Sequence, residues 1–375
     1  MSAAATLQRT PLNAWHRARG GQMVEFAGWD MPVAYAGIVE EHLAVRGCAG
    51  LFDVSHMGRF TLAGAGAEAF LQGLTTNDVT KLAPGTGHYT LALNDRGTVL
   101  DDLIVFRLTA TEFLVIMNAG NREKILAHVK SRVPAGVVFT HRSEEWAMVA
   151  WQGPQAVAIA DRLSPGVIAL PRFAIARVRI AGRECWASRT GYTGEDGVEF
   201  YPEAGLAPAV CDALLAAGES AGARPCGLGS RDGLRLEVAY PLYGHEITED
   251  TTPWEAGLGW VVRMEKGEFL GRAALAAQKA AGIPRRLAAF TCAGPGVPRQ
   301  GYGLTLDGAP AGLVTSGTYS PVLKTGIGLG YLPTGAAEGA ALALVVRGRG
   351  LPAVRVKPPF YKAGSVVSVG SGKTS

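Results

Sequence analysis

The C-terminal part of the chain is divided by glycine and proline into short apolar runs, and this pattern limits the folds open to it. Six such runs follow one another between residues 287 and 356: LAAFT, GYGLTL, AGLVTSG, GIGLGYL, ALALVV and LPAVRV. Short runs separated by turn residues are typical of antiparallel strands. We therefore predict a small antiparallel β-barrel or sandwich in this region.

The front part of the chain mixes helical and strand patterns without alternating them strictly. Helical spacing occupies residues 38–46, 67–74, 121–133, 154–163, 206–216 and 228–240. Strand patterns occupy residues 59–63, 88–93, 98–108, 112–118, 146–151, 173–180, 184–189 and 197–201. This order favours an α+β fold with antiparallel sheets over a doubly wound parallel sheet. A helix and its exit turn at 271–284 place the domain boundary near residue 283, which gives domains at 1–283 and 284–375.

Composition and charge exclude several classes of protein. Charged residues make up 18% of the chain, the formal net charge is +4, and Lys and Arg form no basic run that would bind nucleic acid. No apolar run approaches the ~18 residues of a membrane helix, and the first twelve residues lack a secretory signal. The five cysteines form no C-x-x-C pair and the seven histidines are scattered, so neither a disulfide framework nor a metal site is predicted. We expect a cytoplasmic monomer without a metal.

Two adjacent acids, Asp101 and Asp102, interrupt the apolar strand pattern TVLDDLIVF. Side chains alternate along a strand, so the two acids face opposite ways and one of them points inward. A buried carboxylate costs several kcal/mol unless it is paired, hydrogen-bonded or bound to a ligand. The alternative is that one acid is solvated while the other accepts hydrogen bonds from turn amides.

Two further segments carry polar groups that suit a ligand. The loop at 188–199, SRTGYTGEDGVE, can bring backbone amides, an aromatic ring and carboxylates together, although a flexible polar hairpin is the alternative. In the predicted helix 228–240, Arg231 and Arg235 lie on one side, where the alternative is a row of solvent-exposed salt bridges. A planar, amidine-like heterocycle would need a carboxylate, tyrosines and an amide such as Asn118. These residues predict an enzyme or binder for a polar aromatic small molecule.

Six ordered motifs carry a resemblance to a known family. They are FAGWDMP from Phe26, FDVSHMG from Phe52, LDDL from Leu100, SRTGYTGEDG from Ser188, GLGSRD from Gly227 and LYGH from Leu242. The match is collinear from RTPL at Arg9 to KPPFYK, which ends at Lys362. In these motifs the chain resembles the aminomethyltransferases, the T-proteins of the glycine cleavage system.

The resemblance implies a fold, a reaction and partners. The fold is a three-lobed cloverleaf around a central channel, with a folate-binding mixed α+β front part made of two interleaved lobes and a C-terminal β-barrel. In the reaction, the lipoyl arm of a carrier, the H-protein, brings an aminomethyl group to tetrahydrofolate. The products are 5,10-methylenetetrahydrofolate, ammonia and the dihydrolipoyl carrier. Tetrahydrofolate is a co-substrate, no metal is required, and the implied partners are the transiently bound lipoylated H-protein and the other glycine cleavage proteins.

The resemblance also implies site residues. Asp102 matches the family's key carboxylate near the reactive folate nitrogens, and the sequence does not fully separate it from Asp101. Glu199 matches the acid that grips the pterin edge. The remaining matches are the pocket positions Tyr89, Asn118, Tyr192, Arg231 and Tyr240, and a C-terminal contact, Tyr361. Phe106 stands where some relatives have Tyr, so we assign no hydrogen bond there.

Two kinds of relative with the same folate domain are competing interpretations. Sarcosine and dimethylglycine dehydrogenases carry a flavin domain on the same chain, whereas only eight residues precede Arg9 here. A folate-binding protein that assists iron–sulfur cluster assembly has a K-G-C-Y-x-G-Q-E segment. The corresponding residues 238–245 read VAYPLYGH and contain no cysteine. We therefore expect the aminomethyltransferase.

Overall fold

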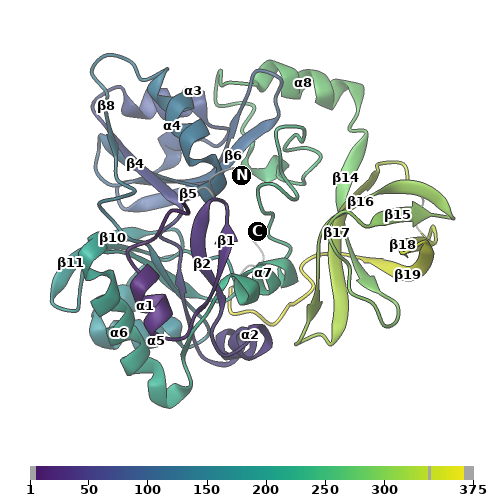
Figure 1. Ribbon diagram of the computed structural model, residues 1–375. Coiled ribbons are helices and arrows are strands. Elements are labelled where there is room, and N and C mark those ends of the chain that lie inside the picture. The colour runs from purple at the N-terminus through teal and green to yellow at the C-terminus, as the bar shows by residue number, and fades with distance from the viewer. Residues whose placement is uncertain (1–5, 337–338, 367–375) are drawn as a thin grey trace.

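The chain folds into three lobes, of which the first two are mixed α/β and the third is a β-barrel (Figure 1). The computed structural model describes residues 6–336 and 339–366. The predicted α+β class, the three lobes and the C-terminal antiparallel barrel are confirmed. None of the described helices combines the length and the apolar character needed to cross a membrane.

The first lobe is built on a five-stranded antiparallel sheet with the strand order β5-β6-β7-β4-β8. Its strands are β4 (Gly58–Ala63), β5 (Thr86–Leu93), β6 (Val99–Arg107), β7 (Glu112–Met117) and β8 (Val138–His141). Two helices, α3 (Ala67–Leu74) and α4 (Arg122–Lys130), pack on one face. Period-two alternation divides the strands between two cores: Phe113 and Val115 face these helices, whereas Leu114 and Ile116 face the second lobe.

The second lobe is built on a six-stranded sheet with the order β10-β11-β12-β9-β3-β13, in which only the β3–β13 pair is parallel among the described strands. The strands are β3 (Gly50–Asp53), β9 (Val149–Gln152), β10 (Ile175–Ile180), β11 (Arg183–Ser188), β12 (Gly197–Tyr201) and β13 (Arg224–Pro225). The helices are α1 (Asn13–Ala18), α5 (Ala156–Leu163) and α6 (Ala207–Gly218). Residues of α5 and α6 and the segment around α1 share one buried core with this sheet.

The two sheets pack against each other through a shared apolar core. Phe106 and Leu114 of the first sheet meet Phe52, Ala150 and Tyr201 of the second, and all five are buried. The front part is therefore layered as helix, sheet, sheet and helix, and both sheets present their edges and loops to the centre of the molecule (Figure 1).

The third lobe is a closed barrel with the strand order β14-β17-β16-β15-β18-β19. Its strands are β14 (Arg285–Cys292), β15 (Gly303–Leu306), β16 (Ala309–Ser320), β17 (Thr325–Pro333), β18 (Leu342–Val346) and β19 (Arg349–Val356). Pairing of β14 with both β17 and β19 closes the ring, which leaves no unpaired barrel edge. Helix α8 (Arg272–Ala281) precedes the barrel, and the expected domain boundary at residue 283 falls between α8 and β14.

Helix α7 (Leu228–Glu237) lies at the centre, packed on α2 (Ile38–Gly47), on β2 (Trp29–Ala34) and on the barrel strands β16 and β17. The prediction of a helix to residue 240 was too long. Ala239 adopts a left-handed conformation with φ of 57°, which ends the helix. The N–H of Tyr240 donates to the carbonyl of Arg235, and that of Ala239 to Leu236, both at 2.9 Å. These two bonds form a Schellman cap, which offsets the roughly 1–2 kcal/mol cost of a left-handed alanine.

A two-stranded hairpin, β1 (Gln22–Phe26) and β2 (Trp29–Ala34), was not predicted. Its turn residues Ala27 and Gly28 both have positive φ, as a two-residue hairpin turn requires. Pro32 inside β2 lacks a backbone N–H, a feature that disfavours a central strand. Short 3-10 segments occur at Val79–Lys81, Ala119–Asn121, Val167–Ala169, Ala204–Leu206, Glu219–Ala221 and Gly259–Val261.

Candidate active site

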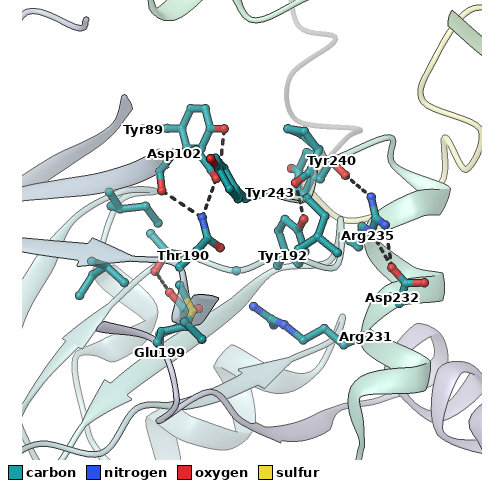
Figure 2. A pocket seen from close by; sticks show the side chains of 18 of the residues that line it. Tyr89, Asp102, Thr190, Tyr192, Glu199, Arg231, Asp232, Arg235, Tyr240 and Tyr243 are labelled. Atoms are coloured by element: carbon teal, nitrogen blue, oxygen red, sulfur yellow. Dashed lines mark hydrogen bonds and ion pairs between the residues drawn. The ribbon is translucent and has the colours of Figure 1, made fainter. Parts of the chain in front are cut away.

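A cavity of about 870 Å³ lies where the two mixed lobes meet α7. Its lining comes from the tip of the β1–β2 hairpin, strands β5, β6 and β12, the loop at 189–197, helix α7 and the segment 240–245. The volume falls in the range of pockets that enclose small organic ligands. Figure 2 shows that the polar side chains converge on this space from several elements.

Asp102 forms one polar corner of the cavity. Strand β6 directs its side chain into the space, beside Tyr89 of the neighbouring strand β5. The Tyr89 hydroxyl donates to Asp102 Oδ2 at 3.0 Å (Figure 2). Asn118 Nδ2 donates to Asp102 Oδ1 at 2.6 Å. Asn118 directly follows β7, so three adjacent strands position this carboxylate. The half-buried Asp102 therefore has a fixed orientation toward any bound molecule.

Asp101 lies behind this corner, outside the cavity lining, and is fully buried. Its carboxylate accepts the backbone N–H of Asn118 at 3.0 Å, the Asn118 side-chain amide at 2.8 Å and the Asn121 side-chain amide at 2.6 Å. The predicted opposite orientation of the two acids agrees with this arrangement. The alternative interpretation describes Asp101, which accepts a turn amide, but not Asp102, which faces an enclosed site.

The two carboxyl groups titrate as a pair. Burial raises the pKa of both Asp101 and Asp102 above the usual 3.8. The charge of Asp102 raises the pKa of Asp101 further, and because this repulsion is mutual, Asp101 acts on Asp102 in the same way. The N–H donors of Asn118 and the Tyr89 hydroxyl oppose the shift, because they stabilise the ionised forms. Protonation of this pair therefore occurs closer to neutral pH than that of an exposed aspartate.

Glu199 of β12 forms a second polar corner and is only 4% exposed. The Thr190 hydroxyl donates to Glu199 Oε2, and Thr190 Oγ1 also lies 2.6 Å from the hydroxyl oxygen of Ser188. Burial raises the pKa of Glu199, while the Thr190 hydrogen bond and the Arg231 charge lower it. A ligand that donates N–H groups to this carboxylate would further favour its ionised form.

Arg231 of α7 brings a positive charge to the same cavity. Its Nη1 is buried and has no hydrogen-bond partner among the residues that the structure describes. The guanidinium carbon lies 4.9 Å from the ring centroid of Tyr192, and Figure 2 shows the side chain pointing toward the side that holds Glu199. A buried donor without a partner is costly, so this nitrogen marks a position for an acceptor on a ligand.

Aromatic rings form much of the remaining wall. The Tyr192 and Tyr240 rings lie 5.8 Å apart at an interplanar angle of 33°, and the Tyr192 hydroxyl donates to the carbonyl of Pro241. Tyr89 stacks on Trp260, with centroids 5.9 Å apart and an angle of 18°. Trp260 is 60% exposed although it lines the cavity, so it stands at the mouth. These rings offer faces on which a planar heterocycle can stack.

Most residues predicted for the site come together here. The lining includes Tyr89, Asp102, Asn118, Tyr192, Glu199, Arg231 and Tyr240. Tyr361 is absent from the described lining, and its ring instead packs 4.2 Å from the guanidinium carbon of Arg46. Phe106 is fully buried in the core between the sheets.

For Arg235, the alternative interpretation of α7 as a helix with a row of solvent-exposed salt bridges is wrong. Arg235 is 1% exposed and pairs with the buried Glu246 at 2.8 Å. The loop at 188–199 is likewise held in place: Arg189 forms a bidentate pair with Asp196, at 2.8 and 2.5 Å. A flexible polar hairpin therefore does not describe this loop.

The lining residues that sequence reasoning did not assign to the site include His56 and Trp260. His56 is buried, its Nδ1 has no described partner, and burial lowers its pKa to about 4, so the imidazole is neutral at pH 7. It belongs to the FDVSHMG motif, which carries the family resemblance, so the motif was a usable signal for this residue. Trp260 carried no local signal. Within the described ranges, no group of three or more His, Cys, Asp and Glu side chains is arranged to hold a metal ion.

Comparisons with known proteins agree over nearly the whole chain. Residues 12–266 match the GCVT N-terminal domain and residues 285–362 match the glycine cleavage T-protein C-terminal barrel domain. The aminomethyltransferase of Desulforamulus reducens is 44% identical over 358 residues, which cover 95% of this chain and 98% of the relative. That of Symbiobacterium thermophilum is 45% identical over 368 residues, covering 96% and 98%.

A solved structure is similar in fold as well. The glycine cleavage system aminomethyltransferase T from Bartonella henselae superposes with a TM-score of 0.89 at 34% identity, covering 96% of this chain and 99% of that one. At this coverage the match includes both mixed lobes and the barrel. The chain therefore belongs to the aminomethyltransferase family, the T-proteins of the glycine cleavage system.

Proposed function

We propose that this chain transfers the methylene of an aminomethyl group from the lipoyl arm of a carrier protein to tetrahydrofolate. The observation that carries the proposal is the meeting of two differently held carboxylates, Asp102 and Glu199, with Arg231 in one cavity walled by tyrosines. In the reaction, the bonds from the methylene to sulfur and to ammonia break, and two bonds to folate nitrogens form. The two protons released by those nitrogens end on the sulfur and on ammonia, so atoms and charge balance.

Glu199 and Arg231 are suited to opposite parts of a pterin edge. The edge has adjacent N–H donors beside a carbonyl acceptor. A carboxylate accepts two parallel N–H bonds, and a guanidinium with an unpartnered nitrogen donates to the carbonyl. The ring pair of Tyr192 and Tyr240 gives a stacking surface next to these groups. We assign recognition of the pterin to this side of the cavity.

Asp102 is suited to the chemical step. A positive charge develops on the folate amine as it takes the methylene, and a preorganised carboxylate stabilises such a charge most strongly in an enclosed site. Tyr89 and Asn118 fix the Asp102 carboxylate without neutralising it. We assign Asp102 to the reacting nitrogens and Asp101 to the support of Asn118.

The carrier is proposed to be a lipoylated H-protein that docks transiently and works with the other glycine cleavage proteins. Its lipoyl arm is flexible, so the protein surface only has to bring the arm to the cavity mouth, where Trp260 stands. The cytoplasmic location and the monomeric state rest on the sequence and stay predictions.

The direct test is ammonia release from aminomethyl-loaded carrier, measured with and without tetrahydrofolate. We expect release to be fast only when tetrahydrofolate is present, with formation of one methylenetetrahydrofolate for each ammonia. Carrier without a lipoyl group is the control. Equal release with and without tetrahydrofolate would contradict the proposed transfer.

Asp102→Asn should lower kcat about 100-fold or more, because it removes the charge but keeps the shape of the side chain. Asp95→Asn is the matched control, since Asp95 is an exposed aspartate in the turn of the same β5–β6 hairpin. Steady-state rates with saturating substrates measure the effect. Full activity of Asp102→Asn would show that another group acts on the folate nitrogens.

Asp101→Asn should act mainly on stability. The side-chain NH2 of the new asparagine would face the N–H donors of Asn118 or Asn121 and leave them without an acceptor. Each unsatisfied buried group lowers the free energy of unfolding by about 1–3 kcal/mol. Thermal unfolding of the two variants separates the roles: we expect a lower Tm for Asp101→Asn and a nearly unchanged Tm for Asp102→Asn. A wild-type Tm in Asp101→Asn would refute the supporting role.

The rate should fall as the pH decreases through the raised pKa of the aspartate pair. The working form of Asp102 is ionised, so activity is present above this pKa and is lost below it. Because the Tyr89 hydrogen bond lowers the pKa of Asp102, Tyr89→Phe should move the acid limb of kcat to higher pH. Tyr319→Phe, at an exposed position of the barrel, is the control. A limb that stays in place or moves to lower pH in Tyr89→Phe would contradict this electrostatic role.

Glu199→Gln should weaken tetrahydrofolate binding by about 1.5–3 kcal/mol, the range of a hydrogen bond to a charged group. Calorimetry measures the affinity directly, and Glu203→Gln, at an exposed position just after β12, is the control. An unchanged affinity in Glu199→Gln would show that Glu199 has only a structural role, through its hydrogen bond with Thr190.

A further inference from the structure

The segment at 361–366, which follows the barrel, returns to the cavity and lies along the loop at 189–197. Val366 lines the cavity, and its N–H donates to the carbonyl of Gly194 at 3.3 Å. Gly364 approaches the same carbonyl so closely that a Cβ at this position would lie 2.5 Å from its oxygen. We call residues 361–366 the C-terminal strap.

Ser365 joins the strap to the loop through three hydrogen bonds. Its hydroxyl donates to Glu195 Oε2 at 2.7 Å, and its backbone N–H donates to the same oxygen at 2.9 Å. The hydroxyl oxygen also accepts the N–H of Asp196 at 2.8 Å. One serine therefore satisfies a buried carboxylate and a loop amide that lie about 170 residues away in the chain.

The other oxygen of Glu195 binds to Arg46 of α2. Glu195 Oε1 accepts from Arg46 Nη1 at 2.8 Å, and the same nitrogen donates to the carbonyl of Thr193 at 2.8 Å. Both side chains are nearly inaccessible, with 5% exposure for Arg46 and 2% for Glu195. Tyr361 of the strap covers the Arg46 guanidinium. The loop is therefore held between helix α2 and the strap.

This arrangement matters because residues 189–196 belong to no strand, so contacts such as these fix the course of the loop. The loop nevertheless places Tyr192 against Arg231 in the cavity. We propose that Ser365 and Glu195 are positioning residues, which hold this loop so that Tyr192 packs on the bound folate. The effect on folate rests on the proposed function, whereas the hold on the loop does not.

Ser365→Ala tests the proposal, with Ser365→Thr as the variant that keeps the hydroxyl. Ser320→Ala is the matched control, because the buried Ser320 hydroxyl donates at 2.5 Å to Glu237, the other carboxylate bound to Arg46, and lies outside the cavity lining. Hydrogen exchange followed by mass spectrometry reports on the amides of residues 191–197, with no folate required. Steady-state rates give KM for tetrahydrofolate and kcat, and thermal unfolding gives Tm.

In Ser365→Ala we expect exchange at 191–197 to be about ten-fold faster and KM for tetrahydrofolate to rise about five- to ten-fold. Its kcat should stay within about two-fold, because Asp102 belongs to the other sheet, and Ser365→Thr should restore both exchange and KM. Ser320→Ala should lower Tm but leave the loop and KM unchanged. Wild-type exchange in Ser365→Ala, or an equal rise of KM in Ser320→Ala, would overturn the proposal. If ammonia release by the wild-type protein did not depend on tetrahydrofolate, the proposed function would be refuted instead. The hydrogen-exchange data would still decide whether the strap holds the loop.

Discussion

A buried ion pair between Arg235 of α7 and Glu246 fixes the helix against the barrel. The two side chains are 1% and 0% exposed, and their charged atoms lie 2.8 Å apart. Arg235 also donates to the Ser316 hydroxyl of β16 at 2.8 Å, while the Tyr331 hydroxyl of β17 donates to the Glu246 carbonyl at 2.6 Å. Removing charges from water costs several kcal/mol for each ion, so α7 cannot shift on the barrel without losing the bonds that offset this cost. The pair therefore helps to fix the cavity residues that α7 carries.

The cavity charges are held differently from those that join the lobes. Arg235 has acceptors around its whole guanidinium, whereas Arg231, one turn earlier on the same helix, keeps a buried nitrogen without a described partner. Glu199 accepts a hydrogen bond from the Thr190 hydroxyl, yet its side chain still lines the cavity. Buried polar groups in folded proteins are almost always satisfied. On α7, the guanidinium that joins the helix to the barrel is thus satisfied, whereas the guanidinium that faces the cavity keeps a donor for a ligand.

The sequence predicted local structure much better than it predicted which residues meet. Period-two patterns and turn residues located the hairpin at 88–108 and all six barrel strands, because neighbours in the chain determine these features. The β1–β2 hairpin was not predicted. Pro32 has a low strand propensity, and only the pairing with β1 in the folded chain overrides that propensity. The residues suggested a heterocycle site, but the family resemblance was needed to select Glu199 and Asp102. No local pattern relates Ser365 to Glu195, since the two residues lie 170 positions apart in the chain and meet only in the folded structure.

The adjacency of Asp101 and Asp102 explains how a strand can hold a reactive carboxylate in a fixed place. Alternation sends the first acid into the protein and the second into the cavity, and Asn118 binds both, donating one amide to Asp101 Oδ1 at 2.8 Å and to Asp102 Oδ1 at 2.6 Å. The buried acid orients the amide through a second bond from the Asn118 backbone. Without an acid at position 101 the Asn118 amide would lose a buried acceptor, and without one at position 102 the cavity would lose the carboxylate beside Tyr89. Two neighbouring acids with opposite orientations therefore supply both the support and the charge, and burial, together with the repulsion between them, raises the pKa of the pair.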